Sequence, residues 1–373
     1  MAAPVGPSTA DWRQKARRFA ATDLLPLAEA IDRGDRLPPG MPRTLGRHGF
    51  MGLGIPPEFG GAGASVQAMA AVLEEISWAS PAVATMLSVH LAVAAAPILD
   101  WGSSAQKKAF LPLMATGECL GAFALTEPGA GSDAAHLACR YERTGDGFRL
   151  SGAKMFITNA SVADVVILFA TRDAAIGHEG ISAFLLPKGT PGRSVGPHFD
   201  KLGLRGSETN EIVLQDARLG PDAMLGTEGQ GLKIALGALT GGRVGIAACA
   251  LGTARAAYDQ MRAAVELDGA EWKRGLLARS FTQLSAASAL VERAAIEKDA
   301  GRPFIETASA AKLAASQAGV EIASHAIDVI GPEAISLAHP AQRILRDARV
   351  FPIVEGTTEI QELILGRSLA TSP

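Results

Sequence analysis

The sequence predicts an α+β protein with an N-terminal helical domain, a central antiparallel β-domain and a C-terminal helical bundle. Three observations predict this order. Residues 1–120 carry apolar side chains at helical spacing, residues 121–229 contain short β-rich runs separated by turns, and residues 230–373 return to helical patterns. The chain has 373 residues, 48% of them hydrophobic and 20% charged, which is enough to bury a large core.

The N-terminal region predicts amphipathic helices interrupted by loops. In DWRQKARRFAATDLLPLAEAIDR we expect a buried stripe made of Phe19, Leu24, Leu25, Leu27 and Ala28. The Gly- and Pro-rich stretch GIPPEFGGAGAS at 54–65 predicts a loop. Helical patterns resume in VQAMAAVLEEISWAS and SAQKKAFLPLMATGE.

The middle region predicts strands. The runs AFALTEP, FRLSGAKMFIT, VVILFAT, ISAFLLP and EIVLQDARL have the length and composition of strands, and TGDG at 144–147 predicts a tight turn. The clearest later helix is ETASAAKLAASQAGVEIASHAIDVIGP, in which Leu313, Val320 and Ile327 recur every seven residues. We expect Gly331 and Pro332 to end it.

Composition argues against several classes of function. A net charge of -3, a pI near 6.2 and 5% aromatic residues favour neither electrostatic nor stacking contacts with nucleic acid. The three cysteines include no CxxC pair and the histidines have no ligand spacing, so we expect neither a disulfide framework nor a metal site.

Targeting and membrane signals are also weak. The segment MAAPVGPSTADW lacks the features of a signal peptide, and the reducing cytoplasm suits the cysteine usage. The longest apolar runs are interrupted at Glu74, Pro97 and Arg243, so we expect no membrane-spanning segment.

The first segment that can carry chemistry is FALTEPGAGSD at 123–133. Its glycines, Gly129 and Gly131, would let backbone N–H groups approach a ligand, and Thr126 and Ser132 add hydroxyl groups. Taken alone, a Gly-rich stretch after a strand is more often only a turn.

The second segment is KMFITN at 154–159. Phe156 offers a flat apolar surface, and Thr158 places a hydroxyl on the same strand face. These two residues could form an aromatic wall and a hydrogen bond for a planar ring, although an ordinary half-buried strand is the commoner case.

The third segment is IVEGTTEIQ at 353–361. Glu355 lies among apolar residues just before Gly356, and burial there would raise its pKa and suit it to act as a base near neutral pH. By residue type alone, a solvated loop glutamate is the commoner case.

Together, these segments resemble the acyl-CoA dehydrogenase family in their order and spacing, over nearly the whole chain. Further matching stretches are SVHLAVAAAPILDWGSSAQKKAFLPLMATGE, KLGLRGSETNEIVLQDARL, LGTEGQGLKIALGALTGGRVGIAACALGTARAAYD and RILRDARV. The resemblance implies a C-terminal four-helix bundle and FAD bound between the β-domain and that bundle.

The resemblance also assigns roles to residues. It implies Glu355 as the catalytic residue, and Ser132, Arg243 and Gly356 at the acyl-CoA site. The implied FAD contacts are Phe123, Leu125, Thr126, Gly131, Ser132, Phe156, Ile157, Thr158, Thr357 and Glu359. Many relatives carry Trp where this chain has Phe156.

The implied reaction is the α,β-dehydrogenation of an acyl thioester. Glu355 would take the α-proton while the β-carbon gives hydride to flavin N5, leaving a 2-enoyl thioester. Hydrogen bonds to the thioester carbonyl, including one from the base's own backbone N–H, would stabilise the developing negative charge. An electron-transfer flavoprotein usually reoxidises the flavin in the family.

The chain departs from the family pattern at elements that cross a subunit boundary. Residues 261–284 lack the Arg-x-x-Phe-Gly stretch, and the position of a family Gln is Asp328, with Glu333 following. Two carboxylates would repel a pyrophosphate. A third departure is Thr240, where relatives commonly have Asp, which leaves room for a carrier-bound acyl group instead of CoA.

These departures leave several hypotheses open. The chain could form a hetero-oligomer with a paralogous subunit that completes the FAD site, or a homo-oligomer that holds FAD in another way. It could be a non-catalytic subunit of a heteromeric enzyme. It could also be an oxidase or a reductase on the same fold.

Overall fold

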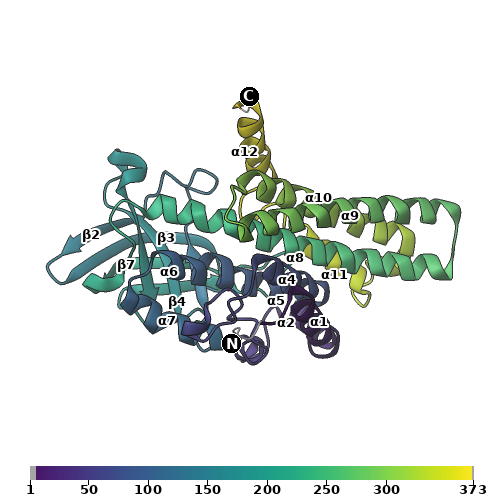
Figure 1. The fold of residues 1–373 in the computed structure, drawn as a ribbon, viewed down its shortest axis with the longest axis horizontal. Helices are drawn as coiled ribbons and strands as arrows, with labels where there is room; N and C mark the ends of the chain where they lie inside the picture. The colour runs from purple at the N-terminus through teal and green to yellow at the C-terminus, as the bar shows by residue number, and fades with distance from the viewer. Residues whose placement is uncertain (1–5, 372–373) are drawn as a thin grey trace, which may run out of the picture.

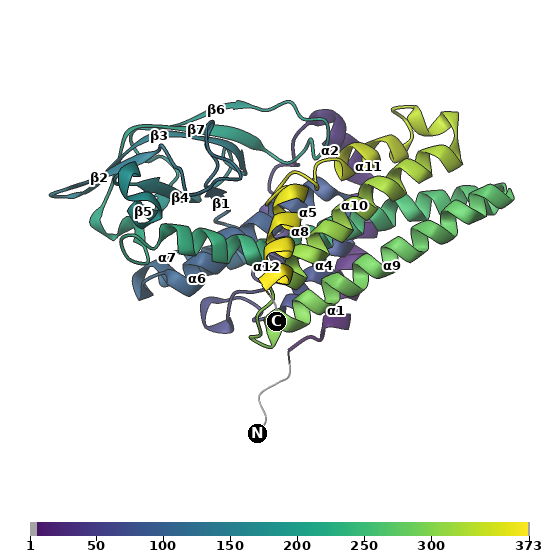
Figure 2. The ribbon, with the colours of Figure 1, turned by 90° about the horizontal axis from the view of Figure 1, so that it is seen from above.

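The computed structural model describes residues 6–371. The expectation that the segment MAAPVGPSTADW is not a signal peptide falls partly on residues outside this range. The predicted succession of helical, β-sheet and helical regions is confirmed. Figure 1 shows the sheet at one end of the molecule and the long helices α8, α9 and α10 extending to the other. Seen from above in Figure 2, the N-terminal helices lie beside α8.

The N-terminal helices begin where the sequence supplies caps. Ser103 and Gln106 form a capping box at the start of α7, and Ser65 caps α4 by accepting from the Ala68 backbone N–H at 3.1 Å. The α-helices of this region are α1 (Thr9–Phe19), α2 (Ala28–Gly34), α3 (Met41–Arg47), α4 (Val66–Ala79), α5 (Pro81–Ser88), α6 (Ala96–Trp101) and α7 (Ser104–Thr116).

Short π- and 3₁₀-helical segments interrupt this series. They are the π-helices η1 (Ala20–Leu24) and η4 (Val89–Ala95) and the 3₁₀ segments η2 (Leu25–Leu27) and η3 (Pro57–Phe59). The expected stripe was wrong at two positions, since Leu25 and Leu27 are 40% and 38% exposed. The π-helix and the 3₁₀ turn change the angle per residue, so the side chains after Leu24 leave the face that ideal helical spacing predicts.

The central sheet has eight strands in the order β6-β7-β3-β2-β4-β5-β8, with β1 paired to β4. It is mainly antiparallel, but β1 pairs with β4 in parallel, and so does β2 at one residue pair. The TGDG turn closes the hairpin between β2 and β3 as predicted. The strands are β1 (Gly121–Ala124), β2 (Arg140–Thr144), β3 (Gly147–Thr158), β4 (Val165–Thr171), β5 (Ile181–Pro187), β6 (Arg193–His198), β7 (Thr209–Leu219) and β8 (Met224–Leu225).

The C-terminal region consists of α8 (Gly231–Leu267), α9 (Glu271–Asp299), α10 (Ile305–Ile330), α11 (Pro340–Ala348) and α12 (Thr358–Thr371). Helix α10 packs mainly against α8 and α9, and α12 stands away from the body in Figure 1. Gly331, with a φ of 88°, ends α10 as predicted. The residues that α10 buries are mostly small, whereas Leu313, Val320 and Ile327 are only half-buried.

The expectation that no segment is apolar enough to span a membrane was wrong by length and composition. The segment Pro81–Trp101 and helix α8 both meet that test. In each, the apolar window is mostly buried inside the protein, 89% and 78% respectively. Such burial is typical of the core helices of a folded domain, which pass the same test.

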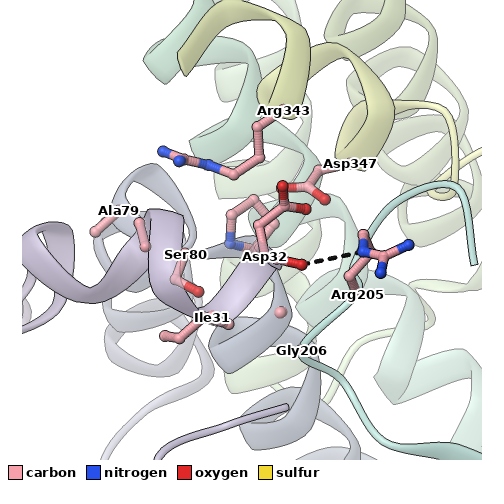
Figure 3. A pocket seen from close by; sticks show the side chains of 11 residues that line it. Ile31, Asp32, Ala79, Ser80, Arg205, Gly206, Arg343 and Asp347 are labelled. Atoms are coloured by element: carbon pink, nitrogen blue, oxygen red, sulfur yellow. Dashed lines mark hydrogen bonds between the residues drawn. The ribbon is translucent and has the colours of Figure 1, made fainter. Parts of the chain in front are cut away.

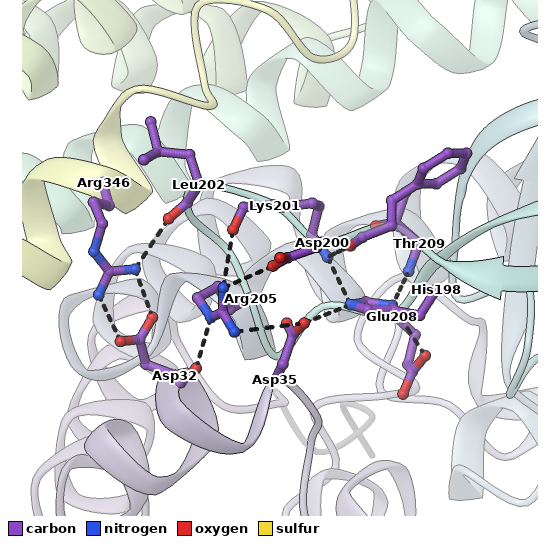
Figure 4. Close-up of polar contacts among 11 residues, drawn as sticks. Asp32, Asp35, His198, Asp200, Lys201, Leu202, Arg205, Glu208, Thr209 and Arg346 are labelled. Carbon is purple, nitrogen blue, oxygen red and sulfur yellow. Dashed lines mark hydrogen bonds and ion pairs between the residues drawn. The ribbon is translucent and has the colours of Figure 1, made fainter.

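A polar network joins α2, the loop between β6 and β7, and α11. Figure 4 shows Arg346 donating to both carboxylate oxygens of Asp32, at 2.9 and 2.5 Å, while Arg205 donates to the Asp32 carbonyl at 3.0 Å. Beside it, Asp347 accepts from the Leu204 N–H at 2.6 Å. The cavity next to this network measures about 10 Å³, so it has no room for a substrate (Figure 3).

The N-terminal helices are tied to α8 by the buried carboxylate of Glu75. Its side chain is 1% exposed and lies 3.1 Å from Arg13, 3.0 Å from Arg17 and 2.7 Å from Arg255. Burial opposes its ionisation, but hydrogen bonds from Arg255 and Arg17 outweigh burial and lower its pKa. Its stabilising effect is therefore present above its ordinary pKa and is lost as the pH falls through the lowered one.

We expect Glu75→Gln to reduce the free energy of unfolding by about 1–3 kcal/mol at pH 7, because it removes the buried carboxylate that Arg13, Arg17 and Arg255 share. Arg13 and Arg255 keep their pairs with Glu74. Urea denaturation measures this loss. The matched control is Glu29→Gln, which removes an exposed pair with Arg33 and should cost less than about 1 kcal/mol. Equal effects of the two substitutions would contradict the assigned role of Glu75.

Candidate active site

Glu355 lies in the turn between α11 and α12, and its carboxylate points into the protein. Both carboxylate oxygens are buried and have no hydrogen-bond partner among the described residues. A Cβ added at Gly242 of α8 would lie only 2.3 Å from Oε2 of Glu355. The absence of a side chain at Gly242 therefore makes room for this carboxylate.

The backbone at Glu355 is unusual for a residue with a side chain. Its φ is 51°, and that of Gly356 is 93°. Only glycine adopts such angles without strain, and a strained non-glycine residue persists only where its surroundings hold it in place. The turn is thus a constrained element that fixes the direction of the Glu355 side chain.

The charges around Glu355 set its acidity. Burial raises its pKa to about 7, although the positive charges of Lys312 and Arg243 act in the opposite direction. Arg243 is 5% exposed, and its Nε has no partner among residues 6–371. Its Nη1 is 3.5 Å from Oγ1 of Thr240, so the residue that replaces the expected Asp lies beside this arginine.

A small apolar cluster extends from the Glu355 carboxylate towards the sheet. Val93 of η4 lies 3.1 Å from the position that a Cβ at Gly242 would take. It packs with Val89, Ala92 and Ala238, and with the half-buried Phe123 of β1. The cluster therefore forms an apolar wall between the sheet and α8, next to a buried carboxylate.

The Gly-rich loop that follows β1 is fixed by a buried ion pair. Lys154 Nζ donates to Glu127 Oε1 at 2.7 Å and to the Leu125 carbonyl at 3.0 Å. Glu127 in turn accepts from the N–H groups of Ala138 and Cys139 at 2.6 and 3.1 Å. Both ends of the loop are thereby held to β3.

The loop and β3 are also joined through their backbones. The Met155 N–H donates to the Thr126 carbonyl at 2.9 Å, so the first and second predicted segments lie side by side. Gly131 and Ser132 lie further along the loop and are exposed, and a Cβ at Gly131 would meet nothing within 4 Å. This part of the loop is open to a ligand.

The second predicted segment presents an exposed aromatic ring. Phe156 is 61% exposed, has a φ of 57°, and its ring lies 4.9 Å from that of Phe199. Thr158 is half-buried, whereas Ile157 is 2% exposed and faces the core of the sheet. Only the backbone of Ile157 is therefore placed to contact a ligand on the Phe156 side.

Two further predicted residues, Thr357 and Glu359, follow the Glu355 turn at the start of α12. Oγ1 of Thr357 accepts from the Ile360 N–H at 3.4 Å, and Glu359 is exposed. Leu125 is buried in the apolar core next to the wall described above. The structure thus brings Glu355, Arg243, Phe123 and the turn at Gly356 around one region.

Sequence reasoning missed four residues that shape this region: Glu127, Lys154, Gly242 and Lys312. A usable signal existed for the first two, because each is a charged residue inside an otherwise apolar or Gly-rich motif. No local pattern marks Gly242 or Lys312. Their importance depends on which helix face meets the Glu355 turn.

Comparison with known proteins follows the same division of the chain. Residues 7–118 match the acyl-CoA dehydrogenase N-terminal domain, residues 122–217 the middle domain, and residues 229–370 the C-terminal domain.

The chain belongs to the acyl-CoA dehydrogenase family.

This family member is 39% identical to the mitochondrial short-chain specific acyl-CoA dehydrogenase of Homo sapiens over 367 residues, which cover 96% of this chain and 89% of the relative. Butyryl-CoA dehydrogenase from Megasphaera elsdenii superposes with a TM-score of 0.95 at 35% identity, covering 99% and 100% of the two chains.

Two further structures bear on flavin chemistry. A chain solved in work on the electron transferring flavoprotein of Acidaminococcus fermentans superposes with a TM-score of 0.96 at 34% identity, covering 100% of both chains. A glutaryl-CoA dehydrogenase from Mycobacterium smegmatis in complex with FADH2 superposes at 0.93 and 29% identity, covering 99% and 96%.

Proposed function

We propose that Glu355 is the base that removes the α-proton of an acyl-CoA substrate. The chain is an acyl-CoA dehydrogenase-type oxidoreductase, and its cofactor is FAD. The observation that carries the assignment of Glu355 is its buried carboxylate, which has no hydrogen-bond partner among the described residues and lies beside an apolar wall. A base with a pKa near the working pH is effective for proton abstraction.

The residues present fit a bound flavin. The exposed ring of Phe156 is held in a left-handed backbone conformation, and such strain is typical of ligand contacts. Thr126 and Thr158 would supply hydroxyl groups beside it, and Gly131 an open backbone. When bound there, FAD supplies the acceptor for the hydride that leaves the β-carbon.

The Glu355 turn also offers a donor to the substrate. The backbone N–H of Glu355 has no acceptor among the described residues. An N–H fixed beside the base can donate to the thioester carbonyl and stabilise the negative charge that develops as the α-proton leaves. Base and donor then belong to the same residue, and the turn fixes both.

We further propose a short acyl chain as the substrate. The wall beside Glu355 is built from the apolar side chains of Val89, Ala92, Val93 and Ala238. The human relative is specific for short-chain acyl-CoA, and the Megasphaera enzyme acts on butyryl-CoA. A carrier-bound short acyl group is the alternative that Thr240 leaves open.

For reoxidation we propose an electron-transfer flavoprotein as the acceptor, since a chain from work on such a protein shares this fold over its full length. An oxidase or a reductase would instead pass electrons to oxygen or take them from a donor. If the chain were instead a non-catalytic subunit, its site would not need a base. The presence of Glu355 argues against that alternative.

We expect Glu355→Gln to lower the rate of flavin reduction by a short-chain acyl-CoA by about 10²–10⁴-fold, because the amide cannot accept the α-proton. Anaerobic stopped-flow measurement of flavin absorbance reports this rate. The control is Glu362→Gln, at an exposed position on α12, which should leave it unchanged. Activity of the Glu355 variant within tenfold of the parent would refute the assignment.

The assembly is a separate proposal. We propose a hetero-oligomer in which a paralogous subunit completes the FAD site, in place of a homo-oligomer. Asp328 and Glu333 are exposed, as are Ile335 and Leu337 at 70% and 73%. A partner at this surface would cover the two aliphatic side chains, whereas two carboxylates suit a pyrophosphate poorly. The loss of the cross-subunit motifs stays a prediction from the sequence.

Purification of the chain alone and with a co-expressed paralogue tests the assembly. We expect FAD content well below one per chain for the lone protein and near one FAD for each complete site in the complex, measured by absorbance after denaturation. Full FAD occupancy and full activity of the lone chain would contradict the hetero-oligomer.

A further inference from the structure

Lys312 occupies a position where a lysine is unexpected. It lies in α10 among the buried residues of that helix, and it is 0% exposed. Lysine is almost never fully buried unless it is paired with an acid. Among residues 6–371, its hydrogen bonds go to backbone carbonyls and not to a carboxylate, and burial lowers its pKa to about 8.

The Lys312 ammonium is instead bound by two backbone carbonyls of the Glu355 turn. Nζ donates to the Gly356 carbonyl at 2.7 Å and to the Pro352 carbonyl at 3.3 Å. These two residues bracket Glu355. The buried charge is thus used to hold both sides of the turn that carries the base.

Neighbouring groups complete the hold on the same carbonyls. Gln361 Nε2 donates to the Gly356 carbonyl at 2.9 Å, and the Thr358 N–H donates to the Pro352 carbonyl at 2.9 Å. Among residues 6–371, Lys312 is the one residue that donates to both carbonyls. Its removal would therefore loosen the link between them, although the Gly356 carbonyl would keep Gln361 as a donor and the Pro352 carbonyl would keep Thr358.

The left-handed backbone of Glu355 shows why such a hold is needed. A non-glycine residue in this conformation costs of order 1–3 kcal/mol unless its surroundings enforce it. Without the hydrogen bonds from Lys312 to the Pro352 and Gly356 carbonyls, relaxation of the turn would move the Glu355 carboxylate away from Gly242. It would also move the Glu355 N–H.

Several charged or titratable groups face this carboxylate. They are the guanidinium of Arg243 and the thiol of Cys249 on α8 and the ammonium of Lys312 on α10; Glu359 of α12 faces Lys312. Arg243 and Lys312 are the two that favour the ionised carboxylate. Of these two residues, Lys312 is the one that also donates hydrogen bonds to the Glu355 turn among residues 6–371.

We propose that Lys312 is a positioning residue for the α-proton base, whose ammonium holds the Glu355 turn through the Pro352 and Gly356 carbonyls and places a positive charge beside the carboxylate. This inference rests on the proposed role of Glu355. It gives a function to a buried charge that the packing of α10 does not require.

The test is the pH dependence of kcat and kcat/KM in the FAD-loaded enzyme with butyryl-CoA as the probe. The parent rate should fall below about pH 7, because the base must be ionised. Lys312→Gln keeps a donor but removes the charge, so the pKa of the base rises. The acidic limb should then move up by about one pH unit, which is a tenfold loss of kcat/KM below the limb.

Lys312→Met removes both the donor and the charge. We expect the same upward shift and, in addition, a kcat at high pH that is lower by on the order of 10²-fold with little change in KM, because the base is misplaced. Lys312→Arg keeps the charge and should leave the limb in place. Lys273→Gln is the matched control in the first turn of α9, where Lys273 is 14% exposed and pairs with Asp268.

An unshifted acidic limb in Lys312→Gln overturns the proposal, even if its kcat falls, because a merely structural lysine would affect stability and not the limb. If Lys312→Met does not fold, the Gln and Arg variants still decide the matter. Failure of the proposed function is distinguishable: Glu355→Gln would then stay active, whatever the Lys312 variants do.

Discussion

The burial of the Glu355 carboxylate against α8 is the constraint on which the rest of the site depends. A carboxylate without hydrogen-bond partners is costly in an apolar environment, and the raised pKa of Glu355 reflects that cost. The same burial makes the group basic enough to take a proton near pH 7. Gly242 permits this arrangement, because any side chain there would meet Oε2.

Two other buried charged side chains near the site form hydrogen bonds with backbone groups. Lys312 donates to carbonyls on both sides of Glu355, and Glu127 accepts from N–H groups at the end of the Gly-rich loop. A buried charge with such partners fixes local geometry more firmly than apolar packing does. Two such contacts therefore hold the segments that would contact substrate and flavin.

Ionic contacts join the N-terminal helical region to the C-terminal helical region. Arg346 joins α11 to α2 through Asp32, and Glu75 joins α4 to α1 and α8.

The order of helical and β-sheet regions could be predicted from the sequence, whereas the roles of the motif residues stay predictions. Helices and strands could be predicted because the spacing of their apolar residues is visible in a short stretch of sequence. Glu355 could be singled out because it lies in the short motif IVEGTTEIQ at 353–361. Local patterns failed where packing between distant segments decides the outcome. Leu313, Val320 and Ile327 recur every seven residues, but this series does not mark Lys312, which is among the mostly small residues that α10 buries. The exposed Leu25 follows a π-helix that no spacing rule anticipates.

The most direct measurement is an infrared titration of the Glu355 carboxyl group, taken as the difference between the FAD-loaded parent and its Glu355→Gln variant. A protonated, buried carboxyl has a C=O band distinct from that of solvated acids. The band should be lost on ionisation with a midpoint near pH 7, in keeping with a pKa of about 7. A midpoint near the ordinary glutamate value of 4.5, or no difference between the two proteins, would contradict a buried base at this position.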